Sequence, residues 1–235
     1  MVRGPAALLV AYAAALAYFA LAGSLPDLGD RDATTIVSGA VGVLALAACT
    51  FTLLPARDEL PALVALAAGG LLLGGALTAA GADAGANVAK VLFAASAGML
   101  LAAWLSLPQL VVVIPVFVAG IDIASVAGGP SELLARDSSR AGEFLSVYLP
   151  AWGGGRAGVL GLADLIFLAF FAASAWRFDL RRRATGIALM LALPATVVIQ
   201  LELDVTVPVL PVLAAALLLP NLDLLPAMLT RADTG

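Results

Sequence analysis

The chain has 235 residues, of which 63% are hydrophobic and only 12% are charged, and its mean hydropathy is +1.07. This composition excludes a soluble globular protein and indicates a polytopic membrane protein. The formal net charge of -4 is small and gives no indication of a nucleic-acid partner. Because Arg outnumbers Lys eleven to one and Ala, Gly and Leu dominate, we read the sequence as GC-rich coding and expect a multi-pass protein of a prokaryotic cell membrane.

Some residue types are absent or nearly so, and this limits the possible chemistry. The chain has no His and one Cys, Cys49. Without histidine, a Ser–His dyad, an HExxH zinc site and a histidine proton relay are excluded. A single cysteine cannot form an intrachain disulfide. The remaining chemistry is that of carboxylates, hydroxyls and the backbone, and we expect neither a metal nor an organic cofactor.

Eight apolar segments are long enough to cross a bilayer, which requires about 20 mostly apolar residues. They predict an all-α transmembrane bundle of about eight spans. The segments are residues 5–23, 35–55, 61–80, 88–106, 108–127, 157–176, 184–202 and 206–227. The first four are rich in small residues and nearly free of polar ones, as is typical of closely packed membrane helices. We therefore interpret residues 1–107 as a scaffold and residues 108–235 as the functional half of one membrane domain.

The linker of residues 128–156 is far longer than the other connections. Glycine-rich stretches, GGP and GGG, mark its two ends. The segment EFLSVYLP, residues 143–150, is apolar and compatible with β-structure. Long connections often carry function, and the alternative is a disordered or surface-lying loop.

Two aspartates, Asp122 and Asp164, lie inside apolar segments on either side of this linker. A carboxylate at the bilayer centre costs about 3 kcal/mol or more unless it is protonated, paired or wetted. Asp122 stands about six residues before the linker and Asp164 about eight after it, so both lie roughly 10 Å in from the same membrane face. Because consecutive helices are usually neighbours, the two carboxyls can face each other.

Two carboxyls at such close range cannot both ionise, so the pair would share one proton. One carboxylate can then activate water while the protonated partner polarises a carbonyl. The structural alternative is that each aspartate caps a broken helix or hydrogen-bonds a neighbour. Other acidic residues fit a site less well, because they lie at span ends, between prolines or among arginines. These are Asp179, Glu202, Asp204 and Asp223.

Three motifs resemble those of the presenilin and signal-peptide-peptidase family of intramembrane aspartyl proteases. GLADLIF at 161–167 is similar to the family's GxGD motif. The family carries its other aspartate one helix earlier, where this chain has Ile121-Asp122. Its PAL motif opens the last helix, where this chain has Pro208-Val209-Leu210-Pro211. The motifs follow the family's order and the resemblance covers roughly residues 108–225.

The resemblance implies hydrolysis of peptide bonds within the membrane, with transmembrane proteins or signal peptides as substrates and no cofactor. Asp122 and Asp164 would share the acid and base roles. The proline-broken last helix, with help from residues 143–150, would hydrogen-bond an extended substrate by strand addition. The substrate-binding residues that the resemblance implies are Gly161, Leu162, Ala163, Pro208, Val209, Leu210 and Pro211.

The chain departs from the family pattern at three positions and in its span count. Ala163 replaces the second Gly of GxGD, Ile121 replaces Tyr, and Val209 replaces the Ala of PAL. The family usually has nine spans. Ala163 and Ile121 motivate one alternative, an inactive relative that binds membrane helices. A second alternative is a proton-coupled transporter, because intramembrane carboxylates and broken helices also serve transport, although no inverted repeat is visible.

Positive charge favours one orientation in the membrane. With the N-terminus in the cytoplasm, seven arginines are cytoplasmic and five basic residues are outside. The cluster Arg181–Arg183 lies close to a span end and therefore weighs most. This orientation places the linker of residues 128–156 outside the cytoplasm.

Overall fold

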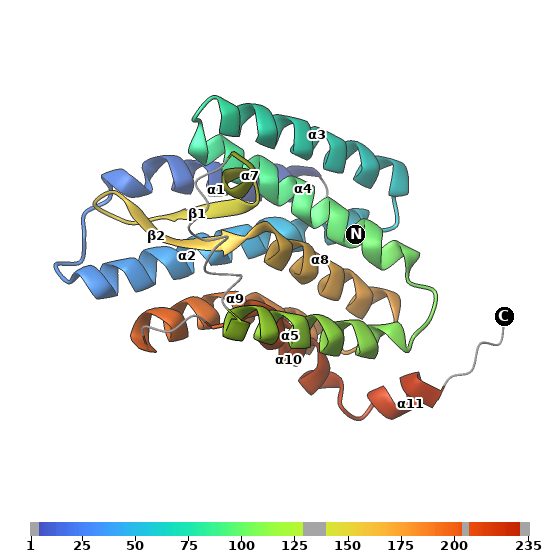
Figure 1. Cartoon of the computed structure of the whole chain (residues 1–235). Coiled ribbons are helices and arrows are strands. Elements are labelled where there is room, and N and C mark those ends of the chain that lie inside the picture. Colours follow the sequence, from blue (N-terminus) through green and yellow to red (C-terminus); the bar gives the residue numbers. More distant parts are fainter. Residues whose placement is uncertain (1–4, 129–139, 204–206, 231–235) are drawn as a thin grey trace.

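The computed structural model describes residues 5–128, 140–203 and 207–230, which form a bundle of helices with one small β-hairpin (Figure 1). The linker residues 129–139 and the acidic residue Asp204 lie outside this part of the chain. The first helices are α1 (Pro5–Leu21), α2 (Arg31–Leu53), α3 (Leu60–Ala79), α4 (Asp83–Trp104) and α5 (Leu110–Gly128). After α7 (Arg140–Phe144) come strands β1 (Ser146–Pro150) and β2 (Arg156–Gly161). The chain continues through α8 (Leu162–Arg177), α9 (Arg182–Leu203), α10 (Val209–Leu218) and α11 (Leu225–Thr230), with short 3-10 turns at Ala22–Ser24, Leu54–Ala56 and Leu219–Asn221.

Five described helical segments are long and apolar enough to cross a membrane. They are Ala6–Ser24, Arg31–Ala56, Leu60–Ala79, Asp83–Trp104 and Arg182–Gln200. The apolar helices in α5 and α10 are shorter. The chain is therefore a mainly helical bundle with several helices of membrane-spanning length, as the composition predicts. The total of eight spans stays a prediction.

Two of the expected spans differ from continuous helices. The segment 157–176 was expected to be helical throughout, but Arg156–Gly161 pairs as strand β2 and the helix begins only at Leu162. The strand forms because β1 supplies hydrogen-bonding partners that a sequence window does not reveal. The segment 206–227 is broken after Leu218, where Pro220 falls in a 3-10 turn. Proline lacks the N–H that would continue the helix.

The segment 143–150, which the sequence shows to be compatible with β-structure, forms strand β1 at Ser146–Pro150, whereas Glu143 and Phe144 belong to helix α7. Strands β1 and β2 are antiparallel, with Tyr148 opposite Val159. The GGG stretch makes the turn, since Gly153, Gly154 and Gly155 have φ of 77°, 103° and 88°. Only glycine adopts such angles without steric cost. The three glycines therefore allow the chain to reverse just before the helix that carries Asp164.

Helix α4 packs between α3 on one side and α8 on the other (Figure 1). A Cβ added at Gly98 of α4 would clash with the carbonyl oxygen of Ile166 and come 2.7 Å from the Cβ of Ala169, both on α8. The absence of a side chain at this position thus permits the close approach of the two helices. The N-terminal half is therefore in direct contact with the helix of Asp164.

The substitution Gly98→Ala is expected to destabilise the protein by about 2 kcal/mol or more, because the new methyl group meets backbone atoms that cannot move aside. The measurement is thermal unfolding of the purified protein in detergent. Gly75→Ala on α3 is the matched control, since a Cβ there meets nothing within 4 Å. A Gly98→Ala protein as stable as the Gly75→Ala protein would contradict the close packing of α4 on α8.

Candidate functional site

Asp122 caps a helix other than its own. It lies in the second half of α5 and is partly buried. Its Oδ2 accepts a hydrogen bond of 2.9 Å from the backbone N–H of Leu210, the second residue of α10. The first N–H groups of a helix have no partner within the helix, and Pro208, the residue before α10, supplies no side-chain cap. The PVLP segment and Asp122 are therefore in direct contact.

Asp164 stands in the first turn of α8, at the junction between strand and helix. Its Oδ2 accepts a hydrogen bond of 3.2 Å from the N–H of Gly161, the last residue of β2. Gly161 has extended backbone angles, φ -67° and ψ 139°, and the next residue is helical. The Asp164 carboxyl is thus fixed where the chain changes from strand to helix.

The two carboxyls lie near enough to interact electrostatically. Helix α10 packs against both α5 and α8 and so connects their two helices. The carboxyl of Asp122 contacts the N-terminus of α10 and that of Asp164 lies at the N-terminus of α8, where the partial positive charge of a helix favours a carboxylate. The structural alternative, capping, is thus realised in both residues. Capping does not prevent the two carboxyls from acting in catalysis, because neither Oδ1 atom accepts a hydrogen bond from the residues that the structure describes.

The other implied substrate-binding residues surround this pair. Leu162 is buried and its N–H donates to the carbonyl of Leu145 at 2.8 Å. Leu210 is buried, whereas Pro208, Val209 and Pro211 are partly buried around the N-terminus of α10. The sequence-predicted residues on β2, α5, α8 and α10 are thus brought together at one place in the bundle.

The two departures next to the aspartates point outward. Ile121 is 53% exposed, and Ala163 is also exposed on the first turn of α8. An exposed methyl or sec-butyl group does not occupy the space between the two carboxyls.

Two polar residues of α4 contact the hairpin, and their role is not evident from the sequence. The Asn87 side chain donates to the carbonyl of Tyr148 at 2.9 Å and accepts from its N–H at 3.4 Å. The Lys90 ammonium donates to the carbonyls of Glu143 at 2.7 Å and Ser146 at 2.8 Å. Lys90 is only 2% exposed. The available signal was its spacing, since a lone Lys three residues after Asn in an apolar segment shares one helix face with it.

The contact between Asn87 and Tyr148 also determines which edge of the hairpin is open. In an antiparallel pair, the N–H and C=O of one residue point to the same side. Tyr148 directs both groups to α4, so Val159, opposite Tyr148, directs its own groups away from β1. No described residue hydrogen-bonds these groups of Val159, and its side chain is exposed. The open edge of β2 leads directly to Gly161 and Asp164.

Comparisons with protein-family models, with curated proteins and with solved structures found no match to this chain. The resemblance to intramembrane aspartyl proteases accordingly rests on the residues of the chain and on the site that they form.

Proposed function

We propose that the protein is an intramembrane aspartyl protease that hydrolyses peptide bonds of membrane-spanning substrates, with Asp122 and Asp164 sharing the acid and base roles. The observation that carries this proposal is the hydrogen bond between Asp122 and Leu210. It joins one aspartate of the pair to the PVLP segment across 88 residues of sequence. This contact supports treating the Asp122 segment and the PVLP segment as parts of one site.

The reaction needs two carboxyls in different protonation states. The ionised carboxylate takes a proton from a water molecule, whose oxygen attacks the substrate carbonyl carbon. The protonated carboxyl donates a hydrogen bond to the carbonyl oxygen as negative charge develops there. Collapse of the tetrahedral intermediate breaks the C–N bond, and the proton taken from water passes to the leaving amine. Each carboxyl uses only its Oδ2 in the hydrogen bonds to Gly161 and Leu210, which leaves one oxygen of each available to water or substrate.

A peptide bond in a helix is hydrogen-bonded within the helix, so the substrate segment must become extended before attack. Extended backbone in an apolar environment needs new hydrogen-bond partners. The open edge of β2 supplies them at Val159, two residues before Gly161. Strand addition at this edge would lead the substrate backbone toward Asp164.

The second candidate function is a proton-coupled carrier, because a carboxylate at the N-terminus of a helix that begins after a proline is also a feature of transporters. An inactive, helix-binding relative is less well supported. The substitutions that motivate it, Ile121 and Ala163, have exposed side chains and do not fill the site.

The test is a cleavage assay with the detergent-purified protein and a single-span peptide, followed by mass spectrometry of the fragments. We expect two complementary fragments whose junction lies inside the apolar segment. If no tested helix is cleaved and the protein instead supports proton-coupled uptake in liposomes, the carrier function replaces the protease.

Gly161→Ala is expected to lower the cleavage rate about 10- to 100-fold. The added Cβ would come 3.0 Å from Oδ2 of Asp164 and would displace the carboxyl. The matched control is Gly158→Ala in the same strand, where the nearest atom lies at an ordinary 3.8 Å. Equal cleavage rates for the two variants would show that Asp164 does not require its present position.

A further inference from the structure

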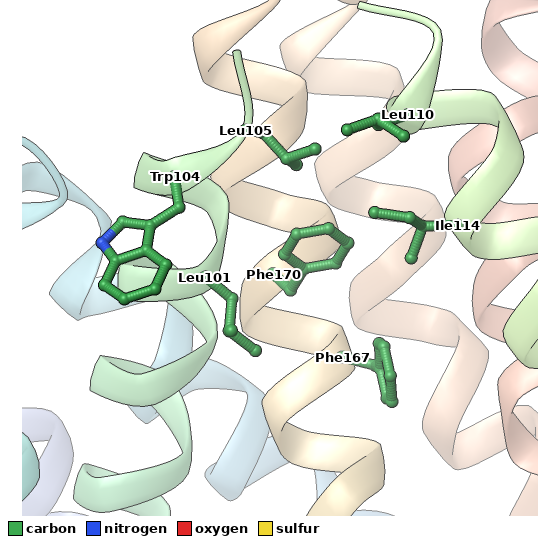
Figure 2. A pocket seen from close by; sticks show the side chains of 7 residues that line it. All are labelled: Leu101, Trp104, Leu105, Leu110, Ile114, Phe167 and Phe170. Carbon is green, nitrogen blue, oxygen red and sulfur yellow. The ribbon is translucent and has the colours of Figure 1, made fainter. Parts of the chain in front are cut away.

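An apolar groove lies between α4, α5 and α8, with a cavity volume of about 240 Å³ (Figure 2). Trp104 at the end of α4 and the following residue, Leu105, line it together with Ile114 from α5 and Phe167 and Phe170 from α8. Trp104 is 82% exposed, although it is the largest apolar side chain of the groove. The groove therefore opens toward the surroundings of the bundle.

The groove runs along α8 toward the aspartates. Its wall on α8 consists of Phe167, one turn after Asp164, and Phe170, and the helix continues from there to Arg177 at its end. Phe167 and Arg177 are ten positions apart in α8, which corresponds to about 15 Å at 1.5 Å per residue. This is about half of the roughly 30 Å hydrocarbon core, which is the depth of one leaflet.

The guanidinium group of Arg177 lies next to this groove. The Nε of Arg177 donates to the carbonyl of Leu105 at 2.9 Å, and Leu105 lines the groove. Arg177 is exposed, and no carboxylate of the described residues pairs with it. Its neighbours differ in this respect, because Arg181 pairs with Asp223 and Arg182 with Asp179. The two terminal nitrogens of Arg177 thus remain available for an anion.

We propose that this groove binds one acyl chain of an anionic phospholipid, with the lipid phosphate at Arg177. An arginine fork matches the oxygens of a phosphate, and an exposed indole is typical of the membrane interface. The groove is too small for a protein helix, whose diameter with side chains is about 10–12 Å. The inference does not depend on protease activity.

The test uses Trp104 as the reporter. Replacing the other two tryptophans, by Trp152→Phe and Trp176→Phe, makes its fluorescence specific. The protein is reconstituted in phosphatidylcholine vesicles containing either brominated phosphatidylglycerol or brominated phosphatidylcholine. We expect the phosphatidylglycerol to quench Trp104 at about tenfold lower mole fraction. Arg177→Gln should abolish this preference, whereas Arg183→Gln, an exposed arginine of the same cluster, should retain it.

Native mass spectrometry of the protein with all three tryptophans gives a second measurement, with one retained phosphatidylglycerol expected and none in Arg177→Gln. Equal quenching by the two lipids, or a preference that persists in Arg177→Gln, would overturn the proposal. The proposal would also be overturned if a single-span peptide protected Trp104 from quenching while neither lipid was preferred. The groove would then bind a protein helix.

Discussion

Asp122→Asn and Asp164→Asn are each expected to lower the rate of peptide cleavage about 100-fold or more while leaving the protein folded. An amide can neither take a proton from water nor donate one as an acid, and general acid–base catalysis contributes about 10²- to 10⁴-fold. The fold should survive because an asparagine oxygen can still accept the hydrogen bond from Leu210 or Gly161. Asparagine caps helices about as well as aspartate.

Comparing Asn and Ala variants separates the loss of catalysis from the loss of the helix cap. Asp122→Ala removes the cap of α10 as well and should cost about 1 kcal/mol in the free energy of unfolding, which Asp122→Asn should not. Asp223→Asn is the control, since this half-exposed aspartate pairs with Arg181 and lies outside the site. It should cleave at the rate of the parent. Cleavage that persists in either Asn variant would exclude the two-aspartate mechanism, and loss in Asp223→Asn would point to general damage.

The parts of the site that the sequence predicts are those encoded locally. Asp122 and Asp164 stand out because a carboxylate in an apolar segment is costly wherever the segment packs. Pro208 and Pro211 predict a helix boundary, and α10 begins at Val209. The GGG stretch announces a turn. Each of these signals depends on a few adjacent residues.

The parts that the sequence does not predict depend on distant partners. Residues 157–161 are predicted from the sequence to begin an apolar helix, and only the pairing with β1 makes them part of a strand. The contacts of Lys90 with Glu143 and Ser146 join residues 53 and 56 positions apart. The close packing of α4, a helix of the predicted scaffold, on α8 also could not be predicted. A glycine such as Gly98 does not indicate which helix will pack against it.

Lys90 is expected to fix the position of the hairpin on α4. Because strand β2 of this hairpin ends at Gly161, Lys90 would also help to position Asp164. Its ammonium group binds two backbone carbonyls and lies 5.9 Å from the ring centre of Phe144. A buried charge is costly unless hydrogen bonds satisfy it, and here the α7–β1 junction provides them. Removing the ammonium would leave the two carbonyls without these donors, at a cost of about 1–3 kcal/mol.

Lys90→Met is therefore expected to release the hairpin from α4 while preserving the length of the side chain. Hydrogen exchange at the amides of β1 and β2 should accelerate about 10- to 100-fold, since about 1.4 kcal/mol corresponds to a factor of ten. Lys90→Arg, which retains donors for both carbonyls, should restore most of the protection. Leu92→Met on the same helix is the control, because this volume-conserving change is well tolerated and Leu92 is only partly buried.

The exchange measurement distinguishes two ways of holding the hairpin. Strands β1 and β2 also pack against α2, where the Cβ of Ala157 would lie 3.6 Å from a Cβ added at Gly39. If Lys90→Met leaves exchange in the hairpin unchanged, this apolar packing on α2 is sufficient and Lys90 has no positioning role. If exchange accelerates and cleavage falls with it, while Lys90→Arg recovers both, the lone lysine of the chain sets the position of the strand next to the aspartates.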